Sequence, residues 1–146
     1  MDFNSPNKTS ISYKFDIEKN DFSQAGQASS TIKKLLRQLG IDPTIIRSAA
    51  IATYEAEINI VIHSEGGQIT VNIYPNFIEI VALDRGPGIE NIELAMQEGY
   101  STASNEIREM GFGAGMGLSN MKKCSDSFDI KTKLGCYTKV TMILNI

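Results

Sequence analysis

Alternating apolar and polar positions predict strands at both ends of the chain. Residues 10–17 alternate four apolar side chains with polar ones, which is the period of a half-buried strand. Four later segments are expected to be strands as well. They are residues 68–73, 77–83, 128–133 and 137–144. The segment 77–83 is nearly continuous in apolar residues, as expected of a central strand, and the last two segments predict a closing hairpin around residues 134–136.

Apolar residues at helical spacing predict a first helix after the opening strand. Asp21 or Ser23 is expected to cap it, and it runs to about Leu39, with Gly40 as its stop. Its apolar face consists of Ile32, Leu35, Leu36 and Leu39. The sequence therefore predicts an amphipathic helix of ordinary length.

A second helix is expected to begin directly afterwards. Asp42 and Pro43 suit the N-cap and the first helical position. From there to about Ser64 the chain is apolar over most of the helical circumference, so this helix should lie well inside the domain. Shorter helical patterns cover residues 89–97 and 116–125.

The order of these elements defines the expected fold class. It is strand, two helices, two strands, short helix, polar segment, helix and two strands, which favours an α+β two-layer sandwich with a mixed β-sheet and helices on one face. The length of 146 residues and the hydrophobic fraction of 42% suit one domain over residues 1–146, with residues 1–9 expected to be flexible.

Composition excludes several classes of function. A net charge of −3 gives no basic footprint for nucleic acid. No apolar stretch is long enough to cross a membrane and the N-terminus does not resemble a signal peptide, so we expect a cytoplasmic protein without a membrane partner. Cys124 and Cys136 lack metal-ligand spacing and His63 is the only histidine, which argues against a structural zinc site.

The second helix carries a stripe of polar and small residues at spacings of four, three, four and four. The stripe is Ser48, Ala52, Glu55, Asn59 and His63. A carboxylate and an amide on a buried helix need partners, so Glu55 and Asn59 are candidate functional residues. The alternative is a solvated edge of the helix, and Glu57 fits that alternative better than Glu55 does.

Residues 84–121 hold seven of the twelve glycines. They form one cluster from Asp84 to Gly88 and a second with glycine at every second position. The second cluster is Gly111, Gly113, Gly115 and Gly117. Glycine lets a ligand approach the main chain, and amides at a helix N-terminus attract phosphate, so the clusters predict a nucleotide phosphate site. The P-loop pattern is absent, and a flexible surface loop is the alternative.

E-x-x-x-N on a buried helix, D-x-G-x-G after a central strand and a glycine-rich loop opening a helix occur in this order. In this respect the chain resembles the GHKL ATPase superfamily of gyrase, Hsp90, histidine kinases and MutL, with the Bergerat ATP-binding fold. The run from Glu98 to Lys123 is most similar to the small bacterial serine/threonine kinases of sigma-factor partner switching, and among these to the stressosome-type switch kinase.

The resemblance implies roles for individual residues. Asn59 matches the asparagine that coordinates Mg²⁺, and Glu55 matches the candidate general base. Asp84 matches the aspartate that accepts a hydrogen bond from the adenine amino group of ATP, while Gly86 and Gly88 let the base lie against the backbone.

The resemblance also implies a phosphate cradle. It consists of Gly111, Gly113, Gly115 and Gly117 with the amides of Met116 and Leu118. Thr138 matches a threonine near adenine. Residues 98–110 are expected to be a mobile lid that orders over the triphosphate, and a phosphate contact for Arg108 stays open.

Three functions use the same residues. The first is a Mg·ATP-dependent protein kinase that phosphorylates a serine or threonine of a STAS-type anti-sigma antagonist. The second is a module that binds a sigma factor or another regulator in an ATP-dependent manner without phosphotransfer, and the third is simple ATP hydrolysis. A homodimer is compatible with all three.

Overall fold

The structure, a computed structural model, describes residues 10–97 and 117–146. This part of the chain consists of one β-sheet and a layer of helices. The sheet has five strands in the order β1-β2-β3-β5-β4. The strands are β1 (Ile11–Ile17), β2 (Gly67–Ile73), β3 (Phe77–Arg85), β4 (Ser127–Lys133) and β5 (Tyr137–Asn145). The helical elements are η2 (Phe22–Gln24), α1 (Gln27–Gln38), α2 (Pro43–His63), α3 (Ile92–Ala95) and α5 (Gly117–Lys123).

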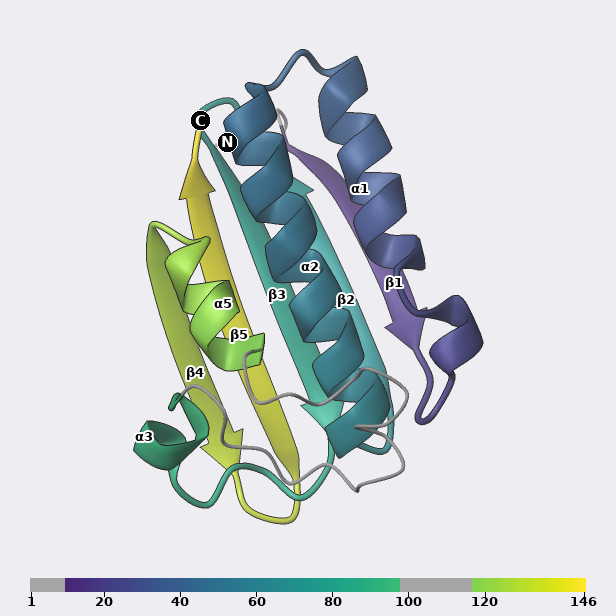
Figure 1. Ribbon diagram of the computed structural model, residues 1–146, viewed down its shortest axis with the longest axis vertical. Helices are drawn as coiled ribbons and strands as arrows, with labels where there is room; N and C mark the ends of the chain where they lie inside the picture. Colours follow the sequence, from purple (N-terminus) through teal and green to yellow (C-terminus); the bar gives the residue numbers. More distant parts are fainter. Residues whose placement is uncertain (1–9, 98–116) are drawn as a thin grey trace.

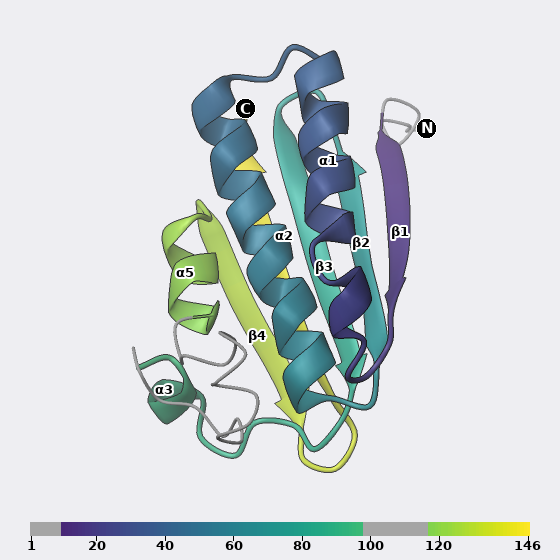
Figure 2. The ribbon, with the colours of Figure 1, turned by 45° about the vertical axis from the view of Figure 1, so that its right-hand side comes forward.

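The helices α1, α2 and α5 lie on the same face of the sheet (Figures 1 and 2). Helix α2 crosses the middle of the sheet, α1 lies on its β1 side and α5 lies on its β4 side. The expected α+β two-layer class is therefore confirmed. Within it we expected a mixed sheet, whereas all four pairings between the described strands are antiparallel.

The core lies between the two layers and follows the strand period. In β2 the odd-numbered residues are buried and the even-numbered ones are half-exposed, because successive side chains point to opposite faces. Ile69 and Ile80 from the sheet and Ile32 and Leu36 from α1 are completely buried. Burial of a large aliphatic side chain contributes about 1.5–3 kcal/mol, so this interface is the main source of stability.

The start of α1 differs from the prediction. Asp21 and Ser23 hydrogen-bond to each other, with Ser23 Oγ donating to Asp21 Oδ1 at 2.6 Å, and neither side chain caps a helix. Helix α1 begins later, after Gly26, whose φ of +98° interrupts the helical path. The cap comes from another element, since Glu57 Oε2 of α2 accepts a hydrogen bond from Ala28 N at 3.3 Å.

Glu57 is consequently buried, with 2% of its surface exposed, and the expectation that it lies on a solvated edge is wrong. The physical reason is the neighbouring helix. The first amides of α1 have no partner within their own helix, and the Glu57 carboxylate lies against them. A helical-wheel argument on α2 alone contains no information about where α1 begins.

Helix α2 begins and ends largely as predicted. Asp42 is its N-cap and accepts a hydrogen bond from Thr44 N at 2.8 Å, and Pro43 occupies the first helical position. At the other end, Ser64 Oγ donates to Ile60 O at 2.6 Å and accepts from Gly66 N at 3.0 Å. The helices of the described residues, α2 included, do not combine the length and apolarity needed to span a membrane.

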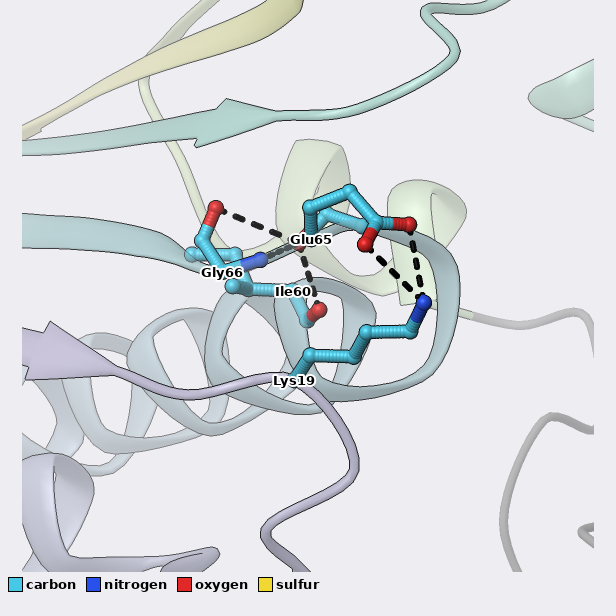
Figure 3. A network of polar contacts seen from close by, with 5 residues as sticks. Lys19, Ile60, Glu65 and Gly66 are labelled. Atoms are coloured by element: carbon cyan, nitrogen blue, oxygen red, sulfur yellow. Dashed lines mark hydrogen bonds and ion pairs between the residues drawn. The ribbon is translucent and has the colours of Figure 1, made fainter.

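The turn after α2 is joined to the opening of the chain (Figure 3). Lys19 Nζ lies 3.0 and 2.9 Å from the two carboxylate oxygens of Glu65. This ion pair is exposed and contributes little stability, but it marks where the loop after β1 passes the start of β2.

The short helix expected over residues 89–97 is also present, but it is shorter and covers only α3. Asn91 Oδ1 accepts a hydrogen bond from Leu94 N at 3.0 Å at its start.

Candidate functional site

Glu55 and Asn59 lie one helical turn apart on the side of α2 that faces α5. Both are half-buried, whereas Ala52 and Ala56 on the sheet side of the helix are buried to 1% exposure or less. Glu55 and Asn59 of the predicted stripe therefore lie at the seam between the two helices, whereas Ala52 of the same stripe belongs to the core. His63 continues the stripe toward the end of α2, and burial lowers the pKa of its imidazole below the ordinary value.

The first turn of α5 packs directly against this stripe. A Cβ atom on Gly117 would lie 3.1 Å from Asn59 Oδ1, so the glycine allows the helix start to approach the amide. One turn further along α5, Asn120 Nδ2 donates a hydrogen bond to Glu55 Oε2 at 3.0 Å.

Asn120 was not among the residues predicted for the site. The local sequence feature that could have identified Asn120 is a polar residue between Ser119 and Met121, which are both buried, on a helix that follows the glycine cluster. Its partner lies 65 positions away, which no local pattern encodes.

Asp84 lies opposite Thr138 in the pairing of β3 with β5. Asp84 Oδ1 accepts a hydrogen bond from Thr138 N at 3.1 Å, and no described residue hydrogen-bonds Oδ2. Burial raises the pKa of the Asp84 carboxyl, while the Thr138 amide and the Arg85 charge oppose that rise. The arrangement leaves an acceptor oxygen on a partly desolvated carboxylate, which suits recognition of an amino group.

The Thr138 hydroxyl belongs to a small network with Thr132. The two Oγ1 atoms lie 3.1 Å apart, Thr132 Oγ1 donates to Tyr137 O at 2.9 Å and it accepts from Ile89 N at 2.9 Å. This network fastens the chain after the Asp84 loop to the β4–β5 hairpin. Thr132, like Asn120, was not among the residues predicted for the site.

Gly86 and Gly88 hold the loop after β3 close to other backbone. A Cβ atom on Gly86 would lie 3.1 Å from Ser64 Cα. Gly88 has a φ of +75°, and a Cβ atom there would lie 2.7 Å from Lys133 O. Packing within the protein thus requires glycine at position 88 and favours it at position 86, whereas the access to a ligand predicted for both stays a prediction.

An open hollow of about 510 Å³ borders this loop. Its walls include His63, Ser64, Arg85 and Gly86, whereas Asn59, Asp84 and Thr138 do not line it. The hollow therefore borders the loop after Asp84 but is not lined by these three candidate site residues. Among residues 10–97 and 117–146, no group of three His, Cys, Asp or Glu side chains is arranged to hold a metal ion.

Part of the predicted phosphate cradle lies outside the described residues. This applies to Gly111, Gly113, Gly115 and Met116, to the expected lid over residues 98–110 and to Arg108. Gly117 and Leu118 are described, and they form the first turn of α5 next to Asn59. Leu118 is half-buried and its side chain packs against the core.

The described geometry fits an adenine nucleotide. One end of the site offers a carboxylate acceptor at Asp84 next to backbone without side chains, and the other offers the Asn59 amide beside the start of α5. The strands β3 and β5 fix the first group, and α2 and α5 fix the second.

Comparison with known proteins agrees with this geometry. Residues 44–146 match the family model described as Histidine kinase-, DNA gyrase B-, and HSP90-like ATPase. The match covers more than half of the chain, and the chain belongs to this family of ATPases. Its nucleotide is accordingly ATP.

Two relatives and one solved structure narrow the comparison. The chain is 38% identical to an anti-sigma F factor of Caldanaerobacter subterraneus over 70% of this chain and 73% of that protein. It is 27% identical to the serine/threonine-protein kinase RsbT of Bacillus subtilis over 76% of this chain and 80% of that protein. A structure of the SiaB-SiaC complex from Pseudomonas aeruginosa matches with a TM-score of 0.62 at 12% identity, over 90% and 88% of the two chains, which supports the fold alone.

Proposed function

We propose that the chain is a Mg·ATP-dependent serine/threonine protein kinase of a bacterial partner-switching system. Its substrate is a serine or threonine hydroxyl on a STAS-type anti-sigma antagonist. The observation that carries this proposal is the position of Glu55 one turn from Asn59, on the face of α2 that meets the start of α5. Similarity to a named serine/threonine kinase supports the same conclusion.

Each residue has a distinct task in this reaction. Asp84 accepts a hydrogen bond from the adenine amino group, and the amides at the start of α5 bind phosphate oxygens. The hydroxyl oxygen of the substrate bonds to the γ-phosphorus while the bond from that phosphorus to the ADP oxygen breaks. Glu55 takes the proton of this hydroxyl. Positioning and charge neutralisation account for most of the catalysis in such transfers.

Asn59 fits a magnesium site. Its side-chain oxygen is a hard ligand on a half-buried helix face beside the α5 start, and Mg²⁺ commonly takes only one or two protein oxygens together with phosphates and waters. When bound, the ion supplies charge neutralisation of the phosphates. Asn59 would hold it one helical turn from the base Glu55.

A second candidate function is ATP-dependent binding of a sigma factor without phosphotransfer. It is favoured by similarity to proteins named anti-sigma F factor, one of which, from Clostridium beijerinckii, is 30% identical over 94% of both chains. A homodimer and a sigma factor are partners compatible with either function. The two candidates differ in whether Glu55 is needed for any measurable activity.

Two substitutions test the assignment. Glu55→Gln should leave the Kd for Mg·ATP nearly unchanged and lower the rate of phosphate transfer about 10²- to 10⁴-fold, because it removes only the proton acceptor. Asn59→Ala should weaken nucleotide binding when Mg²⁺ is present. Calorimetric titration gives the affinities, and transfer of labelled γ-phosphate to a STAS protein from the same organism, or to water, gives the rates.

Glu90→Gln is the matched control, since Glu90 is an exposed carboxylate outside the site. If Glu55→Gln abolished binding while turnover per bound ATP survived, the roles of Glu55 and Asn59 would have to be exchanged. Full phosphotransfer in Glu55→Gln would instead reject Glu55 as the base.

A further inference from the structure

Glu55 has one hydrogen-bond donor among the described residues, and it is a side chain of α5. Asn120 Nδ2 donates to Glu55 Oε2 at 3.0 Å. Because a carboxylate only accepts hydrogen bonds, the Asn120 amide must present its NH₂ group to it. No described residue hydrogen-bonds the other oxygen, Oε1, so the contact distinguishes the two oxygens of the carboxylate.

We propose that Asn120 is a positioning residue for the Glu55 carboxylate, fixing Oε2 so that Oε1 is the oxygen that receives the proton. This inference rests on the proposed function, in which Glu55 is the base. A flexible carboxylate samples several rotamers, and a misplacement of about 1 Å can cost on the order of 10²-fold in rate. A donor locked on a neighbouring helix removes that freedom.

The register of the two helices supports this role. Glu55 and Asn59 are one turn apart on α2, and Asn120 and Gly117 are nearly one turn apart on α5. Gly117 approaches Asn59 while Asn120 contacts Glu55. The same seam between α2 and α5 therefore aligns Asn59, the proposed metal ligand, and Glu55, the proposed base.

The groups around Glu55 are consistent with an Asn120 side chain that orients the carboxylate without neutralising its charge. Cys124 lies one turn beyond Asn120, and burial and then the Glu55 charge raise the pKa of its thiol. Burial followed by the charges of Glu55 and Glu57 raises the pKa of the Tyr54 phenol as well. Both groups stay uncharged near pH 7. Lysine or arginine in place of Asn120 would neutralise the carboxylate, whereas a neutral amide orients it and keeps it available as a proton acceptor.

A double-mutant cycle tests the proposal with the whole chain. Phosphate release from Mg·ATP, with water as the acceptor, is measured for the wild type, Asn120→Ala, Glu55→Gln and the double variant, together with the Kd for a non-hydrolysable ATP analogue. We expect Asn120→Ala to lower kcat at least about tenfold while the Kd changes less than about threefold. In the Glu55→Gln background the same substitution should have no further effect on kcat.

Two further variants complete the experiment. Asn120→Asp is nearly isosteric but replaces the donor with a like charge, so it should lower kcat at least as much as Asn120→Ala does. Lys122→Ala on the exposed side of α5 is the control and should retain the wild-type kcat. Thermal melts establish that each variant is folded.

The outcomes separate this inference from the proposed function. Wild-type kcat in Asn120→Ala, or losses that add to those of Glu55→Gln, would overturn the positioning role and leave Glu55 as the base. Unchanged turnover in Glu55→Gln would reject Glu55 as the base, and the role of Asn120 with it. A wild-type chain that neither releases phosphate to water nor transfers it to a STAS protein would overturn the proposed function.

Discussion

Glu57 places a carboxylate between α1 and α2, two of the helices that cover the sheet. Its surface is 2% exposed, Oε2 accepts from Ala28 N, and Oε1 has no hydrogen-bond partner in the described part of the chain. Desolvation raises the pKa of this carboxyl, and the amides of the first α1 turn only partly oppose that effect. A buried, half-satisfied carboxylate reduces stability whenever it is ionised.

The first prediction concerns the pH dependence that Glu57 produces. Because its pKa in the folded protein lies above the ordinary value of 4.5, the native state holds the proton more tightly than the unfolded state. The free energy of unfolding that Glu57 contributes is therefore complete below pH 4.5 and is lost as the pH rises through the folded-state pKa. Urea unfolding at a series of pH values should show this decline in the wild type and not in Glu57→Gln.

Two comparisons make the result specific. Glu57→Ala should destabilise the protein by about 0.5–2 kcal/mol at acidic pH, where the wild type has a neutral cap, because it removes the acceptor for the α1 amide. Glu90→Gln should reproduce the wild-type pH curve. Parallel curves for the wild type and Glu57→Gln would show that the carboxyl titrates alike in both states.

The loop after β3 is held by the β4–β5 hairpin rather than by its own residues. Gly86 N donates to Cys136 O at 3.1 Å, and Gly135 N donates to Pro87 O at 2.8 Å. The position of Asp84 at the end of β3 thus depends on a turn more than 45 residues later in the chain. The loop after the proposed base-recognition residue Asp84 is thereby held by two backbone hydrogen bonds to the hairpin.

The second prediction compares two glycines with the same φ of +75°. Gly88 faces Lys133 O, where a Cβ atom would lie at 2.7 Å, whereas nothing lies within 4 Å of a Cβ atom on Gly135. Gly135→Ala should cost only the left-handed backbone strain, about 1 kcal/mol. Gly88→Ala should cost about 1–3 kcal/mol more, because the loop must move away from the hairpin.

Chemical denaturation of the two variants measures these costs, and the Kd for ATP measures the displacement of Asp84. Gly88→Ala should weaken ATP binding, and Gly135→Ala should not. Equal losses of stability in both variants would mean that the close approach at Gly88 relaxes without consequence for the loop.

At the scale of the whole molecule, the two halves of the proposed nucleotide site lie on different layers. Asp84 and Thr138 lie on the sheet, and Asn59 and Gly117 lie between α2 and α5. A ligand that contacts both layers binds the folded chain and not the unfolded one. Its binding energy therefore adds directly to the stability of the fold.

The third prediction is that Mg·ATP raises the melting temperature. At a concentration of about one hundred times Kd the stabilisation is about 2.7 kcal/mol, which corresponds to roughly 5–10 °C for a chain of this size. Asp84→Asn should reduce the shift, since a neutral acceptor costs on the order of tenfold in affinity compared with a carboxylate. Differential scanning calorimetry with and without nucleotide provides the measurement.

GTP and the variant Asp129→Asn are the controls. Guanine has no amino group at the ring position where adenine carries one, so GTP should stabilise the wild type much less than ATP does. Asp129 is exposed on β4, and its substitution should leave the shift intact. The absence of any shift at millimolar Mg·ATP would contradict the assignment of the site.

Much of the architecture was predictable from the sequence because it depends on near neighbours. Strand alternation fixed the existence of the five strands, and the Asp42 cap with Pro43 fixed the start of α2. The positions of Glu55, Asn59 and Asp84 also followed, since each belongs to a local pattern on one helix or at the end of one strand. The access to the backbone inferred from the glycine spacing stays a prediction, since Gly111, Gly113 and Gly115 lie outside the described residues.

Only the tertiary structure decided how these elements meet. The burial of Glu57 depends on where α1 begins, and the pairing of Asp84 with Thr138 depends on β5 lying between β3 and β4. The contact of Asn120 with Glu55 joins two helices that no sequence period connects. Local periodicity determines which face of an element is apolar, but the partner of a polar side chain on that face is set by packing between distant segments.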